Sequence, residues 1–304
     1  MSVVTLSPGN NAFFLMPRES APSFVLRLAN FLTVKPDRFL RAFLGDERTL
    51  ASAVYLHHKS DFLAEASGLD RQAASLAFIR RLRDPAGART FLDFTVADHH
   101  IDQTVRRVSP VALARDVEAG IPPYHRLPWS LSDLNHDPET GSPLICACDH
   151  CGRTLTWENC VDVASCGWCG RPLWRATAPD EPMSAFDEFV SALFHPDPIV
   201  RADRRSKLAP VLIGWSEGDL LDLMSTLRRV QRIFPIGLGA QSAGPEVIEA
   251  NSSISRLLNR PLKDAALSED RGAVTVAAAA TTSALMTAPR PIAAFLNSLL
   301  VRRA

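Results

Sequence analysis

Apolar side chains recur at helical spacing through most of the first 140 residues, between short polar stops. This pattern predicts helices near 20–32, 39–45, 71–83 and 109–120. Ser20 and Pro22 are start signals for the first of these segments, and Ser109-Pro110 opens the last. A glycine closes the second and the last, as is typical of helix boundaries. No alternating apolar and polar pattern of any length interrupts them, so we expect the N-terminal part to be helical.

The periodicity disappears in the proline-rich stretch 121–143, which we interpret as a connector. It resumes after a second proline-containing stretch at 176–182. There, Ser184 with Asp187 and Ser216 with Asp219 have the spacing of capping boxes, which predicts helices at 183–194 and from 216 onward. After a glycine-containing break at 237–244, further apolar stripes predict helices near 246–258, 274–286 and 290–301.

Composition and charge narrow the function classes. The 304 residues are 46% hydrophobic, which excludes disorder as the main state. Because 33 Lys and Arg residues balance 33 Asp and Glu residues, the chain lacks the excess positive charge of a general nucleic-acid coat. The first residues lack the pattern of a secretory signal, and the Ala-rich stretch 274–288 is too short and too polar to cross a bilayer. We therefore expect a cytoplasmic protein with no membrane partner.

All six cysteines fall within residues 146–169. Four of them form two copies of Cys-x-x-Cys-Gly-Arg-x-Leu, one beginning at Cys148 and one at Cys166, with Cys151 and Cys169 as the second members. Two such pairs can supply four thiolates to one structural Zn²⁺, which leaves no open coordination position for catalysis. Ordinary thiols and a redox dithiol are the alternatives.

The remaining cysteines and the nearby histidines lack this context. Cys146 and Cys160 lie beside ligand positions and are expected to be spectators or to support the site. His136 and His150 could bind a metal, but solvation or hydrogen bonding is the commoner role of such histidines.

These features predict a mainly α fold in which two helical domains or subdomains flank a small four-cysteine zinc ribbon with short β-hairpins. The expected domains are an N-terminal helical region at 1–140, the zinc ribbon at 141–176 and a C-terminal helical domain at 177–304.

Several motifs together resemble the TniQ family. They are Tyr124-His125-Arg126-x-x-Trp129, the segment from Asp137 to Ile145, the two cysteine motifs, and Pro17-x-Glu19-Ser20 with the helix that follows it. The resemblance covers most of residues 13–175 and implies a bacterial, non-catalytic accessory protein of DNA transposition. It would help to select the target site through DNA and a transposition ATPase or target-recognition complex, and would have no small-molecule substrate. The second zinc motif of many relatives has no cysteine counterpart here.

Clustered arginines are the candidate DNA contacts, because guanidinium groups bind phosphate bidentately and can read guanine. The candidates are Arg153, Arg171, Arg204, Arg205, Arg228 and Arg229. A solvated helix face with carboxylates nearby is the alternative explanation of these candidates.

Two other functions remain open from the sequence. A zinc-ribbon transcription regulator would bind DNA through a helix pair at 274–303, and a hydrolase or nuclease would use scattered Asp and His residues. The histidine pairs at 57–58 and 99–100 give little support to an enzyme, since neighbouring histidines on a helix point in different directions.

Overall fold

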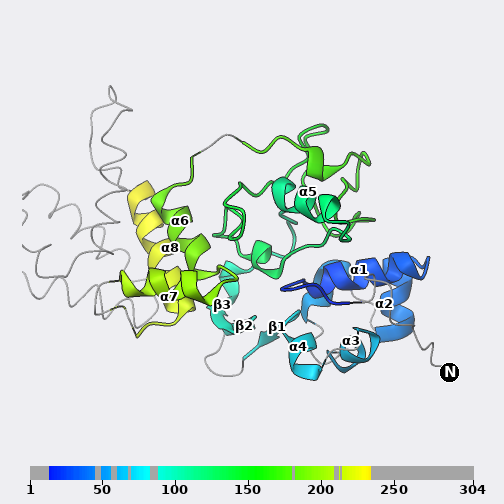
Figure 1. Ribbon diagram of the computed structural model, residues 1–304, viewed down its shortest axis with the longest axis horizontal. Helices are drawn as coiled ribbons and strands as arrows, with labels where there is room; N and C mark the ends of the chain where they lie inside the picture. The colour runs from blue at the N-terminus through cyan, green and yellow to red at the C-terminus, as the bar shows by residue number, and fades with distance from the viewer. Residues whose placement is uncertain are drawn as a thin grey trace, which may run out of the picture. The chain divides into compact units, whose positions relative to one another are not determined.

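The computed structural model describes residues 14–44, 49–55, 60–67, 70–82, 88–179, 182–208, 212 and 214–233 (Figure 1). The chain divides into two compact units, Met1–Met183 and Ser184–Ala304. The cysteine segment thus belongs to the same compact unit as the N-terminal residues.

The first unit begins with short helices. They are α1 (Ala21–Phe31), α2 (Pro36–Leu44), the 3-10 helix η2 (Leu50–Tyr55), α3 (Ser60–Ser67) and α4 (Arg71–Ser75). The helices predicted near 20–32 and 39–45 are confirmed by α1 and α2. Every residue of α1 from Ala21 to Ala29 is buried, so this helix lies in the core instead of covering it.

A three-stranded antiparallel sheet follows, in the order β1 (Ile79–Arg81), β2 (Ala88–Phe91) and β3 (Phe94–Ala97). The predicted helix at 71–83 is therefore wrong beyond Ser75. Of the apolar residues that predicted this helix, Ala74 lies in α4, whereas Phe78 and Leu82 lie directly before and after β1. Residues 79–81 form a strand because β2 pairs with them, Ile79 lying opposite Phe91. Such pairing with a later segment is not visible in the local sequence pattern.

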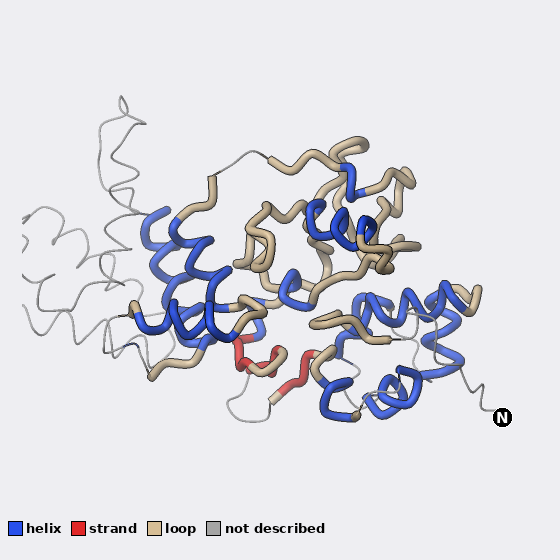
Figure 2. The backbone as a smooth tube through the Cα atoms, viewed as in Figure 1, coloured by secondary structure: helices blue, strands red, loops and turns tan. Residues whose placement is uncertain are grey.

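The rest of the first unit is mostly irregular backbone around α5 (Pro110–Glu118), as the loop colouring in Figure 2 shows. Short 3-10 helices interrupt it, namely η4 (Asp98–His100), η5 (Leu127–Ser130) and η6 (Leu173–Arg175). Helix α5 confirms the prediction at 109–120, since the Ser109 hydroxyl accepts the Ala112 N–H at 3.0 Å and Gly120 has a φ of 66° at the end.

The stretch 121–143 is not a connector. Leu127, Trp129, Leu131 and Leu134 all have 0% exposure, so the irregular segment supplies core side chains to the first unit. Periodicity fails to reveal this because an irregular backbone points buried side chains inward at no fixed interval.

The second unit contains α6 (Ala185–Leu193), α7 (Pro198–Ser206) and α8 (Glu217–Ile233). Both predicted capping boxes are present: the Asp187 N–H donates to the Ser184 hydroxyl, and the Asp219 N–H donates to the Ser216 hydroxyl, each at 3.1 Å. Helix α7 was not predicted from the sequence. The helices predicted beyond 233 lie outside the described residues.

The described elements are thus helices and one small sheet. In the predicted zinc ribbon, strand pairing among described residues is limited to single bridges, such as Ala147 with Thr154 and Ser165 with Pro172. No helix in the described ranges has both the length and the apolar content that a membrane crossing requires.

Candidate metal centre

Two tight turns, the first knuckle (148–153) and the second knuckle (166–171), share one backbone pattern. In each, the glycine N–H donates to the carbonyl of the first cysteine, at 2.9 Å for Gly152 and 2.8 Å for Gly170. The N–H of that cysteine donates in turn to the carbonyl of the arginine after the glycine, at 3.0 and 2.8 Å. The glycine φ values are 69° and 72°, a region that L side chains rarely adopt. The repeated sequence motif is therefore a repeated structure.

The knuckles bring four sulfur atoms together. The Sγ atoms of Cys148 and Cys169 are 3.7 Å apart, those of Cys151 and Cys166 are 3.8 Å apart, and all four lie within 4.8 Å of one another. A tetrahedral ion with metal–sulfur bonds of about 2.3 Å would separate its ligands by about 3.8 Å. The four sulfurs fit such an ion, and each close pair joins one knuckle to the other.

The two thiols of the second knuckle differ in acidity. Burial opposes ionisation of Cys166, but the N–H groups of Cys169 and Trp168 and the neighbouring sulfurs lower its pKa to about 7. The Arg171 N–H favours the Cys169 thiolate, whereas desolvation and hydrogen bonds with the other three sulfurs raise its pKa to about 12. Four thiolates at this distance therefore need a cation to compensate their charge.

The other two cysteines and the nearby histidines stay outside the cluster. Cys146 is exposed, and the buried Cys160 thiol donates to the Asp162 carbonyl at 3.4 Å. Burial raises the pKa of the Cys160 thiol, which keeps it protonated. Neither His136 nor His150 belongs to the group of potential ligands around the four sulfurs.

The cysteine segment is fixed to the rest of its unit by a buried arginine. Arg106 is 1% exposed, and its guanidinium donates to the carbonyls of Val163 at 2.7 Å and Ser165 at 3.1 Å, directly before Cys166. The Arg106 N–H also donates to the Leu155 carbonyl at 2.8 Å, just after the first knuckle. One residue thus holds the chain beside both knuckles.

Apolar contacts reinforce this attachment. Leu155, Trp157, Val163 and Leu173 are each 5% exposed or less, and the Trp157 ring packs edge-on against His125 with centroids 4.9 Å apart. The segment is therefore part of the core of the first unit and not a detached module.

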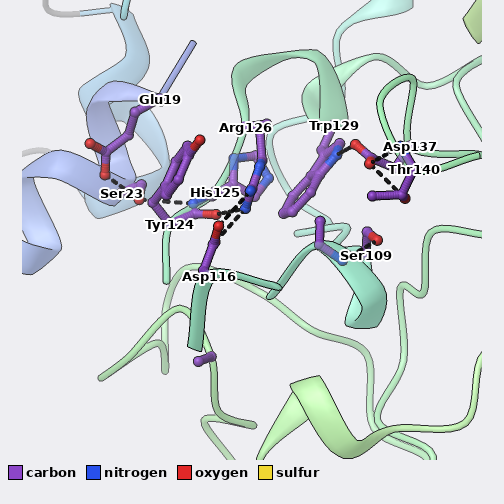
Figure 3. A network of polar contacts seen from close by, with 12 residues as sticks. Glu19, Ser23, Ser109, Asp116, Tyr124, His125, Arg126, Trp129, Asp137 and Thr140 are labelled. Atoms are coloured by element: carbon purple, nitrogen blue, oxygen red, sulfur yellow. Dashed lines mark hydrogen bonds and ion pairs between the residues drawn. The ribbon is translucent and has the colours of Figure 1, made fainter. Parts of the chain in front are cut away.

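The motif residues outside the cysteines form a buried polar network (Figure 3). Glu19 is 0% exposed and accepts the Ser23 hydroxyl at 2.7 Å and two hydrogen bonds from Arg27, at 2.9 and 2.6 Å. Ser20 bonds to His125 Nδ1 at 3.0 Å, and the His125 N–H donates to the Ser23 hydroxyl at 3.0 Å. The network joins the start of α1 to a segment a hundred residues away.

A second part of the network organises the irregular segment itself. Arg126 makes a bidentate pair with Asp116 of α5, with distances of 2.6 and 2.7 Å. The Trp129 indole donates to Asp137 at 2.8 Å, and Asp137 also accepts the Thr140 hydroxyl at 2.7 Å. These side-chain bonds add to the isolated backbone bridges of the segment, such as those of Arg126 with Glu19 and of Leu131 with Ile101.

Burial limits what these groups can do chemically. Desolvation, together with the positive charges of Arg106, Arg107 and Arg126, holds the pKa of His125 well below its usual range, so its ring is neutral. The Glu19 carboxylate accepts hydrogen bonds from Arg27, Ser23 and the Met16 N–H. The network therefore holds the fold together and offers no accessible acid or base.

The candidate DNA-contacting arginines fall into three groups. Arg153 and Arg171 are exposed on the knuckles. Arg204 lies over the Phe189 ring at 4.7 Å, and Arg205 pairs with Glu217 and donates to the Trp215 carbonyl. Arg228 and Arg229 belong to α8, and their side chains lie outside the described part of the chain.

Sequence reasoning missed two residues of this region. Arg106 gave no signal, because one buried arginine in an Arg-Arg pair looks like a surface residue. The position of Trp168 could have indicated its exposure, because an aromatic residue between the two cysteines of a tight turn has little room to be buried.

A scan against protein-family models finds no match to this chain, and a search of curated proteins finds none either.

Proposed function

We propose that the protein is a TniQ-like, non-catalytic accessory protein of DNA transposition that holds one structural Zn²⁺. One observation carries the proposal: the residues of the separate motifs, Glu19, Ser20, His125 and the two knuckles, all lie in one compact unit. Motifs that resemble one family along the sequence thus also depend on one another in space.

Zinc is the metal that best suits the four sulfurs. Cys148, Cys151, Cys166 and Cys169 would hold it, and a soft all-thiolate tetrahedral set is typical of structural zinc. When bound, the ion would supply charge compensation and a crosslink between the knuckles. With four protein ligands it would have no position for water or substrate, which supports a role without catalysis.

The role in target selection follows from the resemblance and from the exposed knuckle arginines. Arg153 and Arg171 extend from a rigid turn, so they are suited to contact DNA phosphates or an acidic partner. Because the chain carries no net positive charge, we expect DNA affinity to be modest alone and to increase with a transposition ATPase or a target-recognition complex.

Metal analysis and a transposition assay test the proposal. We expect about one zinc per chain, and we expect Cys148→Ser to lose the metal and abolish targeted insertion when the protein is supplied with its transposase and ATPase. Cys146→Ser is the matched control, because Cys146 lies outside the sulfur cluster. Absence of zinc, or full insertion activity without the protein, would contradict the proposal.

The transcription-regulator alternative depends on the helix pair expected at 274–303, which lies outside the described residues. No observation on the described residues favours it.

A further inference from the structure

The tip of the second knuckle carries a tryptophan that is exposed but held in place. Trp168 is 46% exposed, and its indole N–H donates to the Thr154 carbonyl of the neighbouring strand segment at 3.2 Å. The Arg153 guanidinium lies 4.8 Å from the centroid of the ring. The ring is thus fixed by one hydrogen bond and one cation–π contact, while nearly half of its surface faces solvent.

The two knuckles that carry this ring each have an arginine. Arg153 and Arg171 are both exposed, and they occupy equivalent positions after the glycines of the two knuckles. Within the described ranges, neither guanidinium is paired with a carboxylate. Nearby, Arg175 stacks on the half-buried Trp174 at 4.4 Å. The surface therefore combines arginines with no acidic partner and an aromatic face.

We propose that this surface, formed by Arg153, Trp168 and Arg171, binds a nucleic-acid strand. Trp168 stacks on an accessible base, and the two arginines contact phosphates. The inference rests on the proposed function, because that function supplies the metal that holds the knuckles. It adds Trp168 as a binding residue and base stacking as its contact with the strand.

Two physical features favour a nucleic acid over an acidic protein segment. An acidic peptide would use the arginines but would leave the flat indole face without a matching partner, whereas every base has a π face that stacks on it. The ring is also held before binding, so little conformational entropy is lost when a base stacks. Binding of this kind tolerates sequence and weakens with salt.

The test uses the full chain loaded with zinc and a fluorescently labelled single strand of about 20 nucleotides, which exceeds the footprint of a small binding module. Parallel arms use the RNA strand of the same sequence, a blunt DNA duplex and a poly-glutamate peptide. We expect the wild type to bind a single strand with an affinity that falls as salt rises, and Trp168→Ala to weaken binding about tenfold or more. Trp168→Phe keeps an aromatic face and should retain most of the affinity.

Two matched controls replace exposed residues elsewhere in the same unit. Val161→Ala removes an apolar side chain that is 64% exposed, and Arg115→Ala removes an exposed arginine of α5; both should bind like the wild type. Zinc content is measured for every variant. If Trp168→Ala loses zinc, the comparison of Trp168→Leu with Trp168→Phe decides, because leucine fills space but cannot stack.

Three results would overturn the inference. In the first, no strand binds at low salt. In the second, Trp168→Ala or Trp168→Leu binds the strand as tightly as the wild type. In the third, poly-glutamate binds and its binding depends on Trp168 to the same extent. Failure of the proposed function is a different result: strand binding through Trp168 would persist while targeted insertion did not require the protein.

Discussion

At the scale of single residues, the most constrained positions lie around the knuckles. Gly167 occupies the place that Asp149 has in the first knuckle, yet it cannot carry a side chain. A Cβ atom added there would lie 2.0 Å from the Asn159 carbonyl oxygen and 2.6 Å from its carbon. Backbone atoms cannot rotate away as a flexible side chain can, so the second knuckle depends on this glycine.

We expect Gly167→Ala to destabilise the first unit by about 2 kcal/mol or more, because the backbone must shift to relieve the overlap. Gly214→Ala is the control, since a Cβ at that position meets nothing within 4 Å. Chemical denaturation of both variants measures the difference. Equal stability of the two variants would show that the Asn159 backbone moves without cost.

The acidity of the cysteine thiols predicts how metal binding depends on pH. Bound thiols must be deprotonated, and the pKa is lowered to about 7 for Cys166 but raised to about 12 for Cys169. Protons therefore compete with the metal throughout the neutral range. Zinc affinity should increase as pH rises from 6 to 8 and decrease as pH falls, with more than one proton released per ion. Competition with a chromophoric chelator measures this, and an affinity that does not change with pH would contradict it.

At the scale of elements, α1 is held by its buried charges as much as by its apolar stripe. Its sequence signals gave its position correctly, but Ser20, expected to cap the helix, makes no side-chain cap and bonds to His125 instead. Capping signals in the sequence locate a helix. They do not reveal that the residue at its start forms a hydrogen bond with a residue far away in the chain.

Removing one member of the Glu19–Arg27 pair should be costly, since the other charge would stay buried without compensation. We expect Glu19→Gln to lower the free energy of unfolding by about 3 kcal/mol. The exposed Lys207–Asp203 pair of α7 is the comparison, where Asp203→Asn should cost well under about 1 kcal/mol. Thermal unfolding of both variants checks the contrast, and similar losses would mean that Glu19 is not held as the structure places it.

Much of the fold and the site could be predicted from local patterns. The spacing of the cysteines identified the four clustered sulfurs, and the capping boxes identified α6 and α8. The sheet and the buried segment 121–143 could not be predicted in this way. Phe94, Thr95 and Val96 alternate between buried and exposed, but three residues are too few to distinguish a strand. Trp129 is fully buried on irregular backbone, where buried positions follow no period.

At the scale of the whole molecule, the cysteine segment shares a core with the N-terminal helices, whereas Ser184–Ala304 forms its own compact unit. Arg106 ties the backbone beside both knuckles to that shared core. Loss of the metal should therefore affect the first unit as a whole and not the second.

We expect chelation of zinc to lower the melting temperature of the first unit by several degrees or to unfold it, while the second unit keeps its own transition. Calorimetry with and without chelator, followed by limited proteolysis, assigns each transition to a unit. A single transition that shifts as one would indicate that the two units unfold together.

The bond between Ser20 and His125 spans 105 positions of the chain, and this has a consequence for synthesis on the ribosome. Helix α2 and η2, which contact α1, leave the exit tunnel soon after it, but the segment that carries His125 follows much later. The first unit can close only once translation has passed the knuckles. Its final assembly is then governed by long-range contacts, which form slowly.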